Sequence, residues 1–267
     1  MAFRLVNRIT ALGAQDVRGI FVVPTFGIFP ESLMAEAVGQ LAAWAAMERC
    51  GFKRRPVAAI AARVTVRRAP APGAELNLAV EIESCDETAI AYNGTAADAS
   101  GPLLELEGSV GPMMPADEFD DPSELRKYFD QLTTTGVVDG LDRSALAEPN
   151  LTFGSCIEDK VSATLAVPES AAFFADHFPR KPVFPATLLL DAQVRIVRAI
   201  PSLKAARERG FSITDVKVRA FTHPGEILSL EAAVRSRENG TCKIALLGRN
   251  QEKKISTAVA EFLTLDA

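Results

Sequence analysis

The chain has 267 residues, of which 48% are hydrophobic and 24% charged, and its net charge of −5 corresponds to a pI of about 5.3. This composition is typical of a globular protein, and the length suits one large domain or two small ones. Because the chain is acidic and only 7% aromatic, nothing in its balance supports nucleic acid as a partner.

A long apolar helix is predicted over residues 30–51. Leu33, Ala37 and Leu41 share one face, and Gly51 stands where a helix C-terminus favours glycine. A helix that is apolar nearly all round is expected at the centre of a fold. The run is too short to span a membrane comfortably, and no signal peptide is recognisable before it. Alternating apolar residues then predict antiparallel strands over 56–68, 71–84, 89–98 and 102–110.

Residues 114–150 interrupt this pattern. They hold an acidic patch at 117–121 and a short helix predicted over 122–132, with a proline near its start. We interpret the segment as a connector packed across the surface, and a disordered linker is the alternative. The predicted units are an N-terminal domain (1–113), the connector (114–150) and a C-terminal domain (151–267).

The C-terminal domain repeats the order of elements found in the first. Phe184 and Pro185 open a second apolar helix, which ends at Pro201. Glu36 and Asp191 each follow the opening proline of their helix by six positions. Strands are predicted over 213–221, 223–236, 242–250 and 254–263. Two copies of one unit, each with a strand, a central helix and then about four antiparallel strands, are therefore expected.

The number and spacing of the histidines and cysteines limit the metal and redox chemistry to be expected. His177 and His223 are the only histidines, so a metal site built from histidine and cysteine is hard to assemble, and we predict none. The widely spaced cysteines show no CxxC pair, and we expect them to be reduced in a cytoplasmic protein. They are Cys50, Cys85, Cys156 and Cys242.

The most informative stretch is FFADHFPRKPVFPATLLLDAQ, residues 173–193. It resembles the signature of the 3-hydroxyacyl-acyl-carrier-protein dehydratase family, approximately HFPGxPxxPG with an acidic residue fourteen positions after the histidine. His177, Phe178 and Asp191 match, as do the prolines at 179, 182 and 185. The resemblance implies an α+β double hot-dog fold, in which two central helices are each wrapped by antiparallel sheet as a fused pseudo-dimer.

The first copy resembles the family differently. With Pro30 aligned to Pro185, Val22 stands in place of the histidine, whereas Glu36 and Gln40 match the family's Glu-Ala-x-x-Gln helix. In the family, each site takes its histidine from one unit and its acid from the other. The resemblance therefore implies one composite site, which joins His177 to Glu36 with Gln40 in support, and leaves Asp191 as a remnant or supporting acid.

The implied reaction is dehydration of a 3-hydroxyacyl thioester to the trans-2-enoyl thioester. Imidazole suits removal of the Cα proton, and a carboxylic acid can give a proton to the leaving hydroxyl. A backbone N–H at the helix start near Ala186 could stabilise the thioester oxygen. No cofactor is required, because the substrate is carried on the phosphopantetheine of acyl carrier protein or on coenzyme A.

Two positions depart from the family, because Arg180 and Ala186 replace its glycines. A glycine that serves an unusual backbone angle would resist such a replacement. Arg180 and Lys181 could instead attract an acidic carrier protein, or belong to a solvated basic face. Phe178 and its aromatic neighbours are either core or the wall of an acyl tunnel.

Two other functions stay open at this point. One is a hot-dog thioesterase, which leaves His177 less well explained. The other is a non-catalytic acyl-binding subunit of a fatty-acid or polyketide-like pathway, which the missing glycines favour. Further pairing of the fused pseudo-dimer into a homodimer is also possible.

Overall fold

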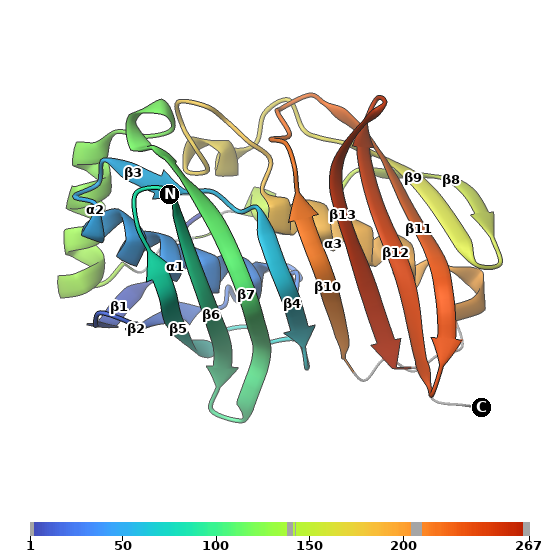
Figure 1. Cartoon of the computed structure of the whole chain (residues 1–267), viewed down its shortest axis with the longest axis horizontal. Helices are drawn as coiled ribbons and strands as arrows, with labels where there is room; N and C mark the ends of the chain where they lie inside the picture. Colours follow the sequence, from blue (N-terminus) through green and yellow to red (C-terminus); the bar gives the residue numbers. More distant parts are fainter. Residues whose placement is uncertain (1–2, 138–140, 142, 204–209, 264–267) are drawn as a thin grey trace.

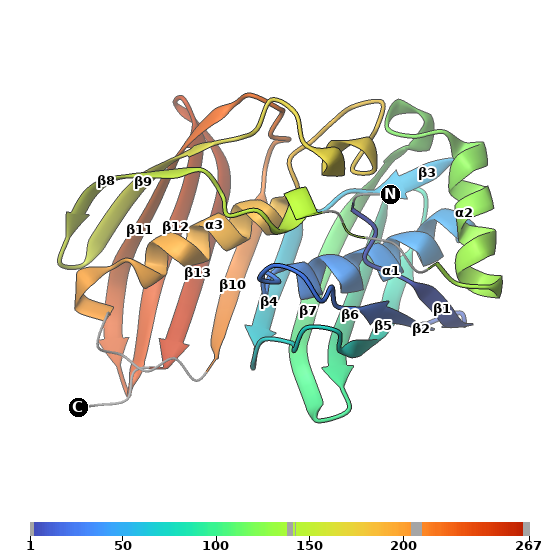
Figure 2. The same ribbon diagram turned by 180° about the vertical axis from the view of Figure 1, so that it is seen from behind.

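The computed structural model describes residues 3–137, 141, 143–203 and 210–263. Their strands form one 13-stranded antiparallel sheet, and two helices, α1 and α3, lie along one face of it (Figures 1 and 2). The helices follow one another end to end across the sheet, and in Figure 2 they lie in front of it, α1 over the strands of the first half of the chain and α3 over those of the second. The molecule is thus a single large sheet with two helices lying end to end on one of its faces.

The first half contains α1 (Leu33–Arg49) and seven strands. These strands are β1 (Arg8–Leu12), β2 (Asp16–Val22), β3 (Arg54–Pro56), β4 (Ile60–Val66), β5 (Glu75–Cys85), β6 (Ala89–Asp98) and β7 (Gly101–Pro115). The second half contains α3 (Ala186–Arg198), β8 (Leu151–Ile157), β9 (Lys160–Ala166), β10 (Phe211–Val218), β11 (Ile227–Glu238), β12 (Thr241–Asn250) and β13 (Lys253–Leu263). Short 3-10 turns occur at Ala116–Glu118 (η1), Arg143–Leu146 (η2), Ala172–Ala175 (η3) and Pro201–Leu203 (η4).

The strand order shows the internal repeat. It reads β1-β2-β5-β6-β7-β4 from one edge and β8-β9-β11-β12-β13-β10 from the other, with β3 attached to β7. The two halves meet at an antiparallel seam between β4 and β10, where Val64 pairs with Ile213 and Thr65 with Ser212. Each half therefore has the same topology, and the β4–β10 pairing joins the two halves into one continuous sheet.

Apolar packing explains why α1 lies at the centre. Ten of its side chains are buried, because the helix is enclosed by the sheet and by the connector helix α2 (Pro122–Thr134). The helix ends at Gly51, whose φ of +62° is accessible to glycine at little cost, and the Phe52 N–H returns to the Met47 carbonyl at 2.7 Å. The predicted helix over 30–51 is confirmed.

The connector forms a helix that packs on the first half. Asp121 caps α2 by accepting the Ser123 N–H at 2.9 Å, and Pro122 occupies the first turn. Tyr128 and Phe129 of α2 lie 5.5 and 6.4 Å from the ring of Trp44 on α1, measured between ring centroids. The second half has no counterpart of α2 within its described residues.

The α+β label needs adjustment. Most of the described chain forms strands, and its α-helices are α1, α2 and α3 alone. The fold is therefore mostly β, with α1 and α3 packed on one face of the sheet. None of these helices is long and apolar enough to cross a membrane. No cluster of three or more metal-binding side chains is found among the residues that the structure describes.

Candidate active site

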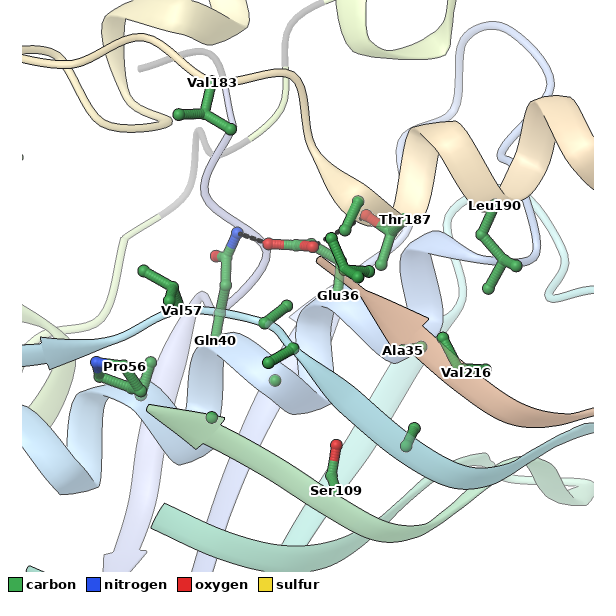
Figure 3. A pocket seen from close by; sticks show the side chains of 18 of the residues that line it. Ala35, Glu36, Gln40, Pro56, Val57, Ser109, Val183, Thr187, Leu190 and Val216 are labelled. Carbon is green, nitrogen blue, oxygen red and sulfur yellow. Dashed lines mark hydrogen bonds between the residues drawn. The ribbon is translucent and has the colours of Figure 1, made fainter. Parts of the chain in front are cut away.

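Glu36 lies on the first turn of α1 and is fixed by both halves of the chain. Its Oε1 accepts a hydrogen bond from Gln40 Nε2 at 3.0 Å, and its Oε2 accepts one from Thr187 Oγ1 on α3 at 2.8 Å (Figure 3). Gln40 is fixed in turn, because its Oε1 accepts the Leu5 N–H at 2.9 Å and its Nε2 also donates to the Phe3 carbonyl. The carboxylate is therefore held in one orientation between the two central helices.

His177 lies on the loop between β9 and α3. Its Nδ1 is 2.7 Å from the Val183 carbonyl oxygen. A carbonyl oxygen can only accept, so Nδ1 carries the hydrogen and Nε2 is the basic nitrogen of the neutral ring. The ring packs edge-on against Phe3, with centroids 5.4 Å apart.

The pKa of His177 is lowered from its ordinary value of 6.5. Burial is the largest cause, and the nearby Arg55 cation acts in the same direction. The Glu36 carboxylate and the hydrogen bond to Val183 oppose the shift. Glu36 and His177 are thus close enough to interact electrostatically, although they come from different copies of the repeat.

One cavity joins these groups. It has a volume of about 210 Å³ and is lined from both sides of the seam, by Trp44, Arg55 and Glu36 of the first half and by His177, Gln193 and Ser256 of the second. Its walls are largely apolar, with contributions from β4, β10 and both central helices (Figure 3). A mainly apolar cavity with a few polar groups is the form expected of a small-molecule site.

Several polar residues of the cavity were not singled out from the sequence, among them Thr187, which holds Glu36. Tyr92 on β6 hydrogen-bonds Ser109 on β7, and burial raises the pKa of its hydroxyl. Arg55 on β3 is nearly enclosed, and burial lowers its pKa to about 10 despite the Asp120 carboxylate, 3.6 Å away. In the sequence, only the alternating pattern of β6 and the position of Arg55 just before Pro56 could have pointed to Tyr92 and Arg55.

Asp191, the acid of the local motif, lies outside the cavity lining. It is buried on α3, where it forms an ion pair with Arg195 at 2.8 Å, and Arg195 also pairs with Glu148. Burial raises the pKa of Asp191, and Arg195 opposes that shift. Asp191 and Arg195 occupy the places that Glu36 and Gln40 occupy on α1, so an ion pair replaces the acid–amide pair.

The predicted equivalence of Val22 and His177 is wrong. Val22 is the last residue of β2 and pairs with Glu75, whereas Ala166 ends β9 and pairs with Ile227 at the matching position of the second copy. Val22 therefore corresponds to Ala166. The loop from the end of the strand to the helix is longer in the second half, and His177 lies on the part of it that the first half lacks.

The replacement of the family's two glycines by Arg180 and Ala186 does not strain the backbone. Neither Arg180 nor Ala186 is among the residues with positive φ, so a Cβ is tolerated at both. Ala186 begins α3 and lines the cavity, as expected for the source of a backbone N–H. The unusual angle falls instead on Phe178, whose φ is +66°.

Arg180 and Lys181 are paired within the chain. Arg180 forms an ion pair with Asp121 at 3.0 Å and donates to the Asp117 carbonyl, and Lys181 lies 3.7 Å from Glu118. Each side chain is about half exposed. The acidic patch of the connector thus already pairs with both positive charges. A role for Arg180 and Lys181 in binding a carrier protein stays a prediction.

The second half of the chain matches a known family. Residues 155–258 match the family model described as ApeI-like: ApeI dehydratase. The 3-hydroxyacyl-(acyl-carrier-protein) dehydratase FabZ of Rhizorhabdus wittichii is 31% identical over 93 residues, which are 33% of this chain and 59% of that relative. The match thus spans less than two thirds of the relative's length.

Solved structures resemble nearly the whole chain. An acyl-ACP thioesterase from Bacteroides thetaiotaomicron has 12% identity and a TM-score of 0.54, with 92% of this chain and 97% of that one covered. A MaoC-like dehydratase has 13% identity and a TM-score of 0.51, with 90% and 84% covered. At these identities the likeness concerns the fold alone.

These likenesses and the repeated helix-and-sheet unit define a double hot-dog fold. Residues 155–258 are similar to an ApeI-like dehydratase family model, and part of the second half is similar to 3-hydroxyacyl-acyl-carrier-protein dehydratases, the family that the His177 motif resembles.

Proposed function

We propose that the chain dehydrates a 3-hydroxyacyl thioester to the trans-2-enoyl thioester, with His177 as base and Glu36 as acid. The observation that carries this proposal is that both residues line one cavity, although they come from different copies of the repeat. The family resemblance supplies the reaction class.

The tautomer of His177 suits the first proton transfer. With its hydrogen on Nδ1 held by Val183, the ring presents unprotonated Nε2 to the cavity and can remove the Cα proton of the substrate. The lowered pKa keeps the ring neutral at pH 7. The Cα–H electrons form the new double bond as the bond from Cβ to oxygen breaks.

Glu36 takes part in its protonated form, and its proton turns the leaving hydroxyl into water, which leaves the carboxylate. Its hydrogen bonds to Gln40 and Thr187 fix the carboxyl orientation in advance, which favours transfer along one direction. The proton held by His177 must return to Glu36 before the next turnover. The N-terminal N–H groups of α3, beginning at Ala186, would stabilise the charge that develops on the thioester oxygen.

The test is incubation with a 3-hydroxyacyl thioester carried on coenzyme A or on acyl carrier protein. The expected product is the 2-enoyl thioester, which has lost one water and absorbs through its conjugated bond. His177→Asn should abolish product formation, whereas His223→Gln, on an exposed loop, should not. Intact substrate in the presence of folded wild-type protein would refute the proposal.

The same assay separates the alternatives. Release of free thiol would identify a thioesterase, the activity for which the Bacteroides protein is named. Binding without conversion would identify an acyl-binding subunit. The absence of strain at Arg180 and Ala186 removes the main argument for that last alternative.

The carrier is proposed to be acyl carrier protein or coenzyme A. The relative from Rhizorhabdus wittichii is named for an acyl-carrier-protein substrate. Comparison of kcat/KM for the same acyl group on the two carriers decides between them.

A further inference from the structure

The connector reaches the loop that carries His177. Phe119, which follows η1, is fully buried, and its ring centroid lies 5.0 Å from that of Phe178, the neighbour of His177. The Phe119 carbonyl accepts the backbone N–H of Arg180 at 3.0 Å. Val57 and Val183 complete this small apolar cluster, which is separate from the main core.

Charged side chains tie the same two segments together. Arg180 and Lys181 on the loop pair with Asp121 and Glu118 on the connector. A third contact runs through β3, because the Arg55 guanidinium lies 4.2 Å above the Phe178 ring and pairs with Asp120 at 3.6 Å. The connector thus contacts the loop directly and also through a residue of the cavity wall.

Phe178 is the residue that requires such support. Its φ of +66° lies in the left-handed region, which is unfavourable for a bulky side chain. Such an angle persists only where surrounding contacts impose it. His177 is adjacent in the chain, so a relaxation of Phe178 would move the imidazole away from the Val183 carbonyl and from the cavity.

We propose that connector residues 117–121 form a clamp that holds the Phe178 turn and thereby positions His177. The clamp is a part of this tandem chain that neither copy of the repeat contains. Phe119 is its central residue, and Arg180 is its anchor on the loop. Both are positioning residues, since they act through the turn. The proposal rests on the proposed role of His177 as base.

The test measures His177 directly, by NMR titration of its imidazole. Assignment is simple because the chain has two histidines, and His223→Gln identifies the remaining signal. In Phe119→Leu, which keeps most of the apolar volume, we expect the turn to loosen and the ring to gain water. The titration midpoint of His177 should then rise toward the ordinary value, and kcat for dehydration should fall at least tenfold.

Charges around His177 come from several elements and are kept unchanged in this variant. They are Glu36 on α1, Arg55 on β3, Asp120 on the connector, and Asp176 beside Arg4, whose Nε lies 3.6 Å from the Asp176 carboxylate. Because Phe119→Leu alters none of them, a shifted midpoint would report the position of the ring.

Arg180→Ala is the second variant, since it removes a half-exposed side chain and leaves the core intact. A smaller shift in the same direction is expected. Lys127→Ala is the matched control, because this exposed residue of α2 pairs with Glu124, a neighbour on the same helix, and not with a residue of the Phe178 turn among the ion pairs of the described chain. It should leave both the titration and kcat unchanged.

An unchanged His177 titration in folded Phe119→Leu would overturn the clamp, whether or not kcat falls. A shift equal to that of Lys127→Ala would do the same. If the wild-type chain shows no dehydration, the proposed function fails, whereas the titration still decides whether the connector positions His177.

Discussion

Glu36→Gln tests the composite site most directly. The substitution keeps the size of the side chain and removes its ability to give or take a proton. The new amide can still accept from Gln40 and can donate to the Thr187 hydroxyl, so both contacts are retained. The fold should therefore lose only about 1 kcal/mol of stability.

The magnitude of the catalytic loss follows from the role of the acid. A positioned acid or base contributes about 10²–10⁴-fold to a rate. We expect kcat to fall by about 10³-fold, which corresponds to roughly 4 kcal/mol of transition-state stabilisation. Because the carboxylate now raises the pKa of His177, its removal should lower that pKa further, in a direction opposite to that expected of a loosened turn.

Asp191→Asn is the matched control. It makes the same chemical change at the equivalent position of α3, outside the cavity lining. It weakens the ion pair with Arg195 and should cost about 2 kcal/mol of stability, with kcat within threefold of wild type. Both variants are assayed by enoyl-thioester formation and by urea denaturation. Loss of turnover in Asp191→Asn, with turnover retained in Glu36→Gln, would refute the pairing.

Three further outcomes are expected. Because burial lowers the pKa of His177, kcat/KM should stay constant as the pH falls to 6.5 and should decrease only at the lower pH where the ring takes up its proton. The stability that neutral His177 contributes is present above pH 6.5 and is lost as the pH falls through the lowered pKa. A midpoint of kcat/KM above pH 6.5 would contradict this direction of the shift. Ala186→Gly restores the family residue at a position without strain, so kcat should change less than threefold in the same enoyl assay. Gly94→Ala places a Cβ on β6 against Val38 of α1 and should lower the free energy of unfolding by about 1–3 kcal/mol, measured by urea denaturation, whereas Gly101→Ala meets no neighbouring atom and reports the backbone cost alone.

Much of the architecture could be predicted because it repeats. The spacing from each opening proline to its acid located both central helices, and the alternating leucines of β5 and β11 placed the strands. The pairing of Glu36 with His177 came from the family resemblance. Both residues were then found in the wall of one cavity.

What escaped prediction depends on loop length and on contacts distant in the chain. The alignment of Val22 with His177 counted back from Pro30 and Pro185 and assumed that the loop before each central helix has the same length. The loop before α3 is longer, so Val22 is not the equivalent of His177. Arg55 and Tyr92 belong to no local motif, and only the folded sheet brings them beside Glu36. The contact between Phe119 and Phe178 joins residues 59 positions apart, and no periodicity predicts it.

The seam between β4 and β10 has a consequence for how such a chain can evolve. In a homodimer built from one gene, every substitution appears twice, so a change that improves one site is imposed on the other. Covalent fusion removes that coupling. One copy could shorten its loop and keep the acid, while the other kept the histidine and exchanged its acid for the pair of Asp191 and Arg195. Each helix was then free to specialise.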